Sequence, residues 1–244
     1  MSEKKTTEEP KKASPVAESS SATDFALPFR VLITPLKTFG QLAQRPTAKG
    51  LITLSVLILA ITAAAQYASA TKIFLTVNGQ PASLLASDGF AGWFGAAVLT
   101  SSGYAIMYWL VLVVGLALIS RTVGGKDVSL RGSLVILGYL LSVFVVIYTV
   151  RTIMYLALPS IVFPIGSWPP VDQVDVDAAV SLITRDWDPL LVYQFGKYFT
   201  VVGFGWLAVL GTIAVKQMRE ISWTKASIVS VVGFMFTFFL FGLP

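Results

Sequence analysis

The sequence predicts an all-α fold: a polytopic helical membrane protein with five transmembrane helices, its N-terminus in the cytoplasm and its C-terminus outside. Three observations support this prediction. Long stretches carry no charged residue, only 13% of the 244 residues are charged, and most of the 18 Lys and Arg residues fall on one predicted side. Soluble domains contain about 25% charged residues. With a mean hydropathy of +0.75, the composition indicates that the bilayer is the main solvent of this chain.

Five uncharged stretches have the length of membrane spans. A helix needs about 20 apolar residues to cross a hydrocarbon core of roughly 30 Å. The five stretches are Gly50–Thr71, Gly89–Ser120, Gly132–Val150, Tyr198–Val215 and Ala226–Pro244. An odd number of spans places the two termini on opposite sides of the membrane.

Residues 152–171 form a further uncharged stretch, which makes a sixth span an alternative. Prolines interrupt this stretch, and each proline removes a helix donor and clashes with the preceding turn. Lipid does not satisfy the backbone groups that are freed in this way. We therefore interpret Thr152–Leu158 as the outer end of a long third helix, with Arg151 reaching outward to the headgroups. Residues 159–194 then form an extracytoplasmic loop.

The positions of Lys and Arg predict the orientation, because positively charged loops stay in the cytoplasm. Most of these residues precede the first span, or lie in the second-to-third and fourth-to-fifth connections. The long loop after the third span is acidic instead. It carries Asp172, Asp175, Asp177, Asp186 and Asp188. This distribution places residues 1–49 inside and the acidic loop outside.

The chain divides into a tail, a juxtamembrane segment and a membrane domain. Residues 1–24 are rich in Ser, Thr, Lys and Glu and contain no aromatic residue, which predicts a disordered cytoplasmic tail. Residues 25–49 form the juxtamembrane segment, and residues 50–244 form the five-span domain.

The juxtamembrane segment is predicted to contain a short amphipathic helix. Pro35 suits its first position, Phe39 and Leu42 share its apolar side, and Pro46 ends it. Basic residues surround the helix, so we expect its apolar side to lie in the cytoplasmic headgroup layer. A connector folded under the bundle is the alternative.

Residue types that common catalytic and metal sites need are missing. The chain has no Cys and no His, and no Asp or Glu lies within the five spans. The acidic loop fails the calcium-loop pattern, because Asp177 and Ile183 stand where Gly and Glu are required. We therefore expect no enzyme activity, no cofactor, no metal and no nucleic-acid partner.

Two short motifs resemble the prokaryotic members of the Yip1-domain family. The first is residues 34–46, directly before the first span. The second combines a Gly-Gly turn, Gly124 and Gly125, with a Gly-Tyr pair, Gly138 and Tyr139, in the third span. The five-span arrangement with an inside N-terminus is also similar to that family.

The resemblance covers residues 30–244 and has two departures. Residues 140–143 follow the Gly-Tyr pair where the family often has a proline, and the acidic loop is longer than in the family. The Asp-Leu-x-Gly-Pro motif of the eukaryotic members is absent. This favours the plasma membrane of a prokaryote, with a eukaryotic endomembrane as the alternative.

The resemblance implies a function without catalysis. Eukaryotic relatives act in vesicle traffic and bind Rab GTPases, a role with no counterpart in a prokaryote. We therefore expect an integral membrane scaffold or adaptor, surrounded by the lipid bilayer, which organises a membrane-protein partner or a second copy of the chain. The candidate interface residues are Pro35, Phe39, Leu42, Pro46, Gly124, Gly125, Gly138 and Tyr139.

A small-solute permease or channel is the alternative function. A water-filled cavity lined by Gln66, Ser101, Ser102 or Tyr104 would favour it.

Overall fold

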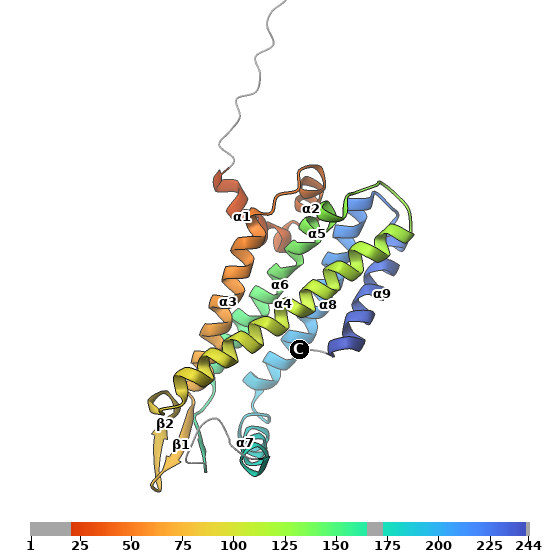
Figure 1. The fold of residues 1–244 in the computed structure, drawn as a ribbon. Helices are drawn as coiled ribbons and strands as arrows, with labels where there is room; N and C mark the ends of the chain where they lie inside the picture. The colour runs from red at the N-terminus through yellow and green to blue at the C-terminus, as the bar shows by residue number, and fades with distance from the viewer. Residues whose placement is uncertain (1–20, 165–172, 243–244) are drawn as a thin grey trace, which may run out of the picture.

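The structure, a computed structural model, describes residues 21–164 and 173–242 (Figure 1). The predicted disordered tail, residues 1–24, falls almost entirely outside the described residues. Its last residues form the first turn of helix α1, Ser21–Ile33. The chain that follows is a bundle of long helices with short elements at both ends (Figure 1).

The predicted five membrane spans are confirmed. Among the described residues, five helical segments are long and apolar enough to cross a membrane. They are α3 (Lys49–Ala70), α4 (Phe90–Thr122), the third span (Leu130–Ala157), α8 (Leu191–Arg219) and α9 (Trp223–Phe241). The third span ends at Ala157, so the residues read as its outer end do continue the helix.

The third span is the central helix of the bundle. It consists of α5 (Leu130–Gly138), one 3₁₀ turn η2 (Tyr139–Leu141) and α6 (Ser142–Ala157). Of its most apolar window, 72% is buried within the protein, whereas the other spans bury 44% or less. The other spans therefore keep broad apolar faces for lipid; α3, α4 and α8 pack against the third span, and α9 packs against α4 and α8.

Three aromatic rings join the central span to two of its neighbours. Tyr108 of α4 contacts Phe144 of α6 and Phe204 of α8, with ring centroids 5.9 Å and 5.3 Å apart. Phe144 and Phe204 also contact each other, at 5.8 Å. All three pairs are edge-on, the arrangement that aromatic quadrupoles favour. This cluster holds α4, α6 and α8 together in the middle of the bundle.

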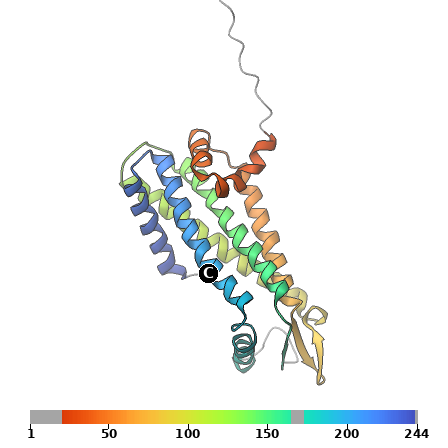
Figure 2. The same cartoon turned by 180° about the vertical axis from the view of Figure 1, so that it is seen from behind.

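The two ends of the bundle differ (Figures 1 and 2). One end, called the α2 end, contains α1, α2 (Pro35–Gln44), the α4–α5 connection at residues 123–129 and the α8–α9 turn at residues 220–222. The other, called the sheet end, contains three strands and α7 (Gln173–Asp186).

The three strands are an addition to the all-α prediction. They are β1 (Ile73–Val77), β2 (Gln80–Ser83), followed by the 3₁₀ turn η1 (Leu84–Ala86), and β3 (Ile161–Phe163). The sheet order is β2-β1-β3, with β1 antiparallel to β2 and parallel to β3. The sheet therefore ties the segment after α3 to the segment after α6.

The segment predicted as an extracytoplasmic loop, residues 159–194, lies at the sheet end and contains both β3 and α7. Trp187 anchors it: only 3% of this residue is exposed, and its indole N–H donates to the carbonyl oxygen of Pro159 at 3.0 Å. The α8 helix begins at Leu191, before the predicted end of the loop. A small second core, separate from that of the bundle, therefore closes the sheet end.

Candidate functional site: the α2 end of the bundle

Helix α2 docks on the protein with its apolar side. Phe39 and Leu42 are 0% and 1% exposed, and α2 packs chiefly against α8. The expectation that this apolar side lies in the headgroup layer is therefore wrong for Phe39 and Leu42, and the connector alternative describes them better. Leu36, on the same helix, is 49% exposed and remains available to lipid.

The length of α8 explains this docking. Its 29 residues span about 43 Å at 1.5 Å per residue, whereas the hydrocarbon core is about 30 Å thick. The helix is thus longer than a crossing needs, and its last turns contain the buried Val215 and Met218. An apolar wall at this height can cover Phe39 and Leu42 with closely packed atoms.

The bounds of α2 follow its two prolines. Pro35 is the first helical residue, where the missing N–H leaves no hydrogen bond unmade. The helix ends at Gln44, and the N–H of Arg45 still donates to the carbonyl oxygen of Gln41 at 2.9 Å. Pro46 is exposed in the short link to α3. The two prolines therefore keep α2 short, so that the whole helix can pack on α8.

The Gly-Gly turn is seated on the end of α8. Gly124 and Gly125 have φ angles of +77° and +99°, which side chains disfavour. A Cβ atom at Gly125 would lie 2.4 Å from the carbonyl oxygen of Arg219. That same oxygen accepts a 2.8 Å hydrogen bond from the N–H of Lys126. The absence of a side chain at Gly125 therefore allows the turn to bond to the end of α8.

Arg219 connects the turn to α4. It is 3% exposed, and its Nε donates to Ser120 Oγ at 3.3 Å while its Nη1 donates to the Lys126 carbonyl at 3.1 Å. In the sequence, Arg219 stands out only as one of the positive charges near the fourth-to-fifth connection, and this role could not be predicted. Its position as the last residue of the long α8, beside a Gly-Gly turn in space, has no signature in the sequence.

The Gly-Tyr pair attaches α3 to the central span. A Cβ at Gly138 would lie 2.7 Å from the side chain of Leu51, so glycine lets α3 approach closely. The Tyr139 hydroxyl donates to the carbonyl of Thr47 at 2.9 Å, and its ring occupies the space beside Gly50. The pair therefore fixes the point at which the juxtamembrane segment enters α3.

All eight candidate interface residues thus lie at the α2 end, and they bring α2, α3, the central span and α8 together. Their contacts stabilise the end of the bundle. The outer surface of α2 is formed by other residues, including the exposed Lys37, Gln41 and Arg45. An exposed ion pair, Lys126 with Glu220 at 2.7 Å, lies across the adjoining turns.

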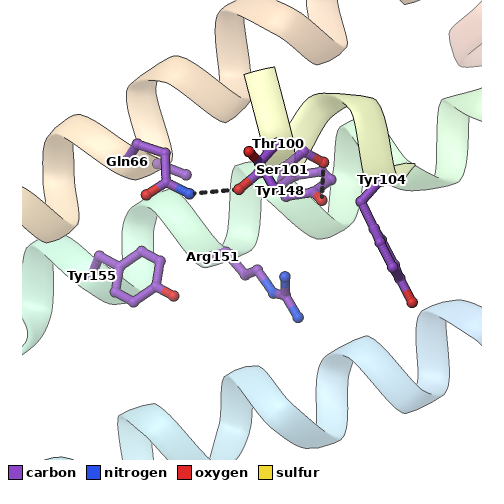
Figure 3. Close-up of a pocket in the computed structure, with 8 residues that line it drawn as sticks. Gln66, Thr100, Ser101, Tyr104, Tyr148, Arg151 and Tyr155 are labelled. Atoms are coloured by element: carbon purple, nitrogen blue, oxygen red, sulfur yellow. Dashed lines mark hydrogen bonds between the residues drawn. The ribbon is translucent and has the colours of Figure 1, made fainter. Parts of the chain in front are cut away.

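A second feature lies nearer the sheet end. A cavity of about 390 Å³ is lined by residues of α3, α4 and α6 (Figure 3). The lining residues are Ala65, Gln66, Thr100, Ser101, Tyr104, Tyr148, Arg151 and Tyr155.

Two hydrogen bonds organise the wall of this cavity. Gln66 Nε2 donates to Ser101 Oγ at 2.9 Å, and the Tyr148 hydroxyl donates to the Ser101 carbonyl at 3.3 Å (Figure 3). The cavity thus unites three of the four residues that the sequence analysis named for a permease. The fourth, Ser102, is buried and bonds back to the carbonyl of Val98 in its own helix.

The Arg151 side chain, which was expected to reach outward to the headgroups, lies on the wall of this cavity. It is half-buried, its guanidinium lies 5.7 Å from the centre of the Tyr148 ring, and it points from α6 toward α8 (Figure 3). Tyr148 and Tyr155 stand three residues before and four residues after Arg151. This helical spacing is the signal that could have revealed a polar side of the third span.

A protein-family model described as the Yip1 domain matches residues 29–243. The chain belongs to the Yip1-domain family. The matched region begins in α1 and includes every span, the α2 end and the cavity. No curated protein and no solved structure matches the chain. Yip1-domain proteins are membrane proteins that are generally without catalytic activity, so membership places this chain in a multi-pass, lipid-embedded class.

Proposed function

We propose that this Yip1-domain protein is an integral membrane scaffold or adaptor, which holds a membrane-protein partner or a second copy of itself at the α2 end. The observation that carries the proposal is the docking of α2. Because α8 covers Phe39 and Leu42, α2 is held in one orientation with Lys37, Gln41 and Arg45 exposed. A polar surface held rigidly beside a membrane is suited to binding another protein, since little order is lost on binding.

The proposal includes an orientation, with the α2 end in the cytoplasm. Exposed basic residues outnumber acidic ones at this end within the described part of the chain, as the positive-inside rule requires. The exposed basic residues are Arg30, Lys37, Arg45, Lys49, Arg121, Lys126, Arg131 and Lys225, and the acidic ones are Asp127 and Glu220. We place the protein in the plasma membrane of a prokaryote, and a eukaryotic endomembrane would present the same end to the cytoplasm.

Affinity purification from native membranes tests the adaptor function. The wild-type chain, the double variant Lys37→Glu with Arg45→Glu, and the control Lys72→Glu at the sheet end are compared. We expect the wild type and the control to retain a partner or a second copy. The amount of partner or second copy that co-purifies with the double variant should be about tenfold lower, because the reversed charges repel a surface that complements α2. Recovery of the wild type as a lone monomer would contradict the proposal.

A small-solute permease is the second candidate, and the cavity that contains Gln66, Ser101 and Tyr104 favours it. Solute flux into proteoliposomes, with Thr100→Trp as a variant that narrows the cavity, is the measurement that separates it from the adaptor. An adaptor gives no flux above that of empty liposomes, whereas a permease gives flux that this variant reduces.

A further inference from the structure

The Arg151 cavity lies at the depth of lipid headgroups. Gln66 stands four residues and Arg151 six residues before the sheet-end termini of α3 and α6, at Ala70 and Ala157. At 1.5 Å per residue, these separations are about 6 Å and 9 Å. The third span has 28 residues, or about 42 Å, and so extends beyond a core of about 30 Å. Arg151 is therefore near the boundary between acyl chains and headgroups.

The lining of the cavity favours an anion. Arg151 supplies a permanent positive charge in a planar fork of N–H donors, which matches the oxygens of a phosphate. Thr100 and Tyr155 add hydroxyl groups, whereas the Tyr104 hydroxyl already donates to the Phe241 carbonyl oxygen at 2.5 Å. Within residues 26–164 and 180–242, whose side chains are described, the lining contains no carboxylate. A cation would be repelled here, whereas an anion gains from both the charge and the donors.

A second cation lies beyond Arg151. An adjoining space of about 130 Å³ is lined by Arg151, Tyr155, Tyr193 and Lys197, which brings α8 into the same region. The Lys197 ammonium is paired with Asp188 and lies 5.0 Å from the centre of the Tyr193 ring. Arg151 and Tyr155 line both spaces, which therefore lie on either side of these two residues.

The size and position of the cavity fit a headgroup. Its volume of about 390 Å³ is within the range of small-molecule sites, about 300–1,000 Å³. Thr100 is exposed on the outer surface of α4, at the edge of the cavity, so a ligand can enter from the side of the bundle. A site reached from the side at this depth meets the lipids of the adjacent leaflet.

We propose that the Arg151 cavity binds a phosphate group, carried either by a phospholipid of the sheet-end leaflet or by a free phosphate anion. The Arg151 guanidinium donates paired hydrogen bonds to two phosphate oxygens, and the Thr100 and Tyr155 hydroxyls donate to the remaining ones. This site is separate from the α2 end and holds whether or not the protein is an adaptor.

Native mass spectrometry of the purified full-length protein tests the site. Three probes are titrated: phosphatidylglycerol, a diacylglycerol with the same acyl chains, and inorganic phosphate. The variants are Arg151→Gln, Arg151→Lys and Thr100→Trp, with Lys72→Gln as a control cation at the same end that does not line the cavity. Thr100→Trp blocks the opening from an exposed position and leaves Arg151 in place, so it decides the question if Arg151→Gln does not fold.

We expect one phosphatidylglycerol to bind wild type and Lys72→Gln equally, and Arg151→Gln and Thr100→Trp about tenfold or more weakly. Arg151→Lys should be intermediate, because it keeps the charge and loses the fork. Competition by inorganic phosphate would identify a free anion as sufficient, and its failure to compete would identify the lipid; both results support the site. Equal binding of phosphatidylglycerol to all variants, or equal binding of diacylglycerol to the wild type, would overturn it.

Discussion

At the scale of single residues, Gly124 and Gly125 are adjacent and differ in what surrounds them. Both have left-handed backbone angles. A Cβ at Gly124 would meet nothing within 4 Å, whereas a Cβ at Gly125 would meet the backbone oxygen of Arg219 at 2.4 Å. Backbone of a helix end moves far less readily than a side chain. Gly124 is therefore required for its conformation alone, and Gly125 for conformation and space together.

These surroundings predict different effects of the same substitution. Gly124→Ala should lower the free energy of unfolding by about 1–2 kcal/mol, the usual cost of an L-residue in this conformation. Gly125→Ala should lower it by about 1–3 kcal/mol more, because the turn must move off the end of α8. Thermal or denaturant unfolding in one detergent, with both variants side by side, measures the difference. Equal destabilisation would show that the turn is not seated on α8.

Arg151 illustrates what the sequence leaves open about one residue. The sequence predicted Arg151 near the end of the third span, and it lies six residues before the end of α6, because position along a helix follows from residue count. It did not determine which way the side chain points, since that depends on how the helix is rotated against its neighbours. Tyr148 and Tyr155 lie on the same side of the helix as Arg151, and this spacing in the sequence indicates a polar side of the third span.

At the scale of elements, the start, the end and the apolar side of α2 were predicted from the sequence. The packing of that side against α8 was not predicted. An amphipathic helix needs something apolar beside it, and lipid and protein both meet that need. The choice depends on α8, which lies far away in the sequence and has 29 residues, more than a membrane crossing needs. Local pattern therefore predicts the helix, and only the assembled bundle determines what covers Phe39 and Leu42.

The revised position of Phe39 gives a sharper mutational test. Phe39→Asp should release α2 from the bundle, because a charged carboxylate replaces a fully buried ring; truncating such a ring alone costs about 3–5 kcal/mol. Gln41→Asp, on the exposed side of the same helix, is the matched control and should have little effect. The chain has no cysteine, so a spin label at Gln44→Cys reports the mobility of α2 cleanly. Low mobility in both variants would mean that Phe39 does not hold α2.

The sheet was missing from the prediction although its sequence contains a strong local signal. Asn78 and Gly79 have φ angles of 51° and 76°, and Val77 pairs with Gln80 across them. An Asn-Gly pair between two strands is the commonest sequence for a two-residue hairpin loop. The parallel pairing of Ile73 with Ile161 has no such signal, because β2, η1, α4 and the whole third span lie between the two strands in the sequence.

At the scale of the whole molecule, the five spans and the family could be predicted, because both depend on local properties. A span is a matter of length and missing charge, and the family motifs are short runs of the chain. The contacts between helices at the two ends of the bundle could not be predicted from the sequence. The Gly-Gly turn on Arg219 and the cavity around Arg151 combine helices far apart in sequence, and neither has a spacing that a linear motif records.

The bundle presents two polar regions to two sides of the membrane. The α2 end is basic and closed by buried contacts, whereas the sheet end carries the acidic α7 and the Arg151 cavity. The central aromatic cluster of Tyr108, Phe144 and Phe204 lies between them. The protein binding proposed for the α2 end and the phosphate binding proposed for the cavity are thus separated by a packed core.

The adaptor function proposed for the α2 end requires that this end faces the cytoplasm, and labelling of single cysteines tests this directly. Gln41→Cys places a thiol on the exposed side of α2, and Thr184→Cys places one on exposed α7, in a chain that otherwise has none. A membrane-impermeant maleimide should label Thr184→Cys in intact cells, and Gln41→Cys only after permeabilisation. Labelling of Gln41→Cys in intact cells, with Thr184→Cys protected, would contradict the orientation and the adaptor function proposed for the α2 end.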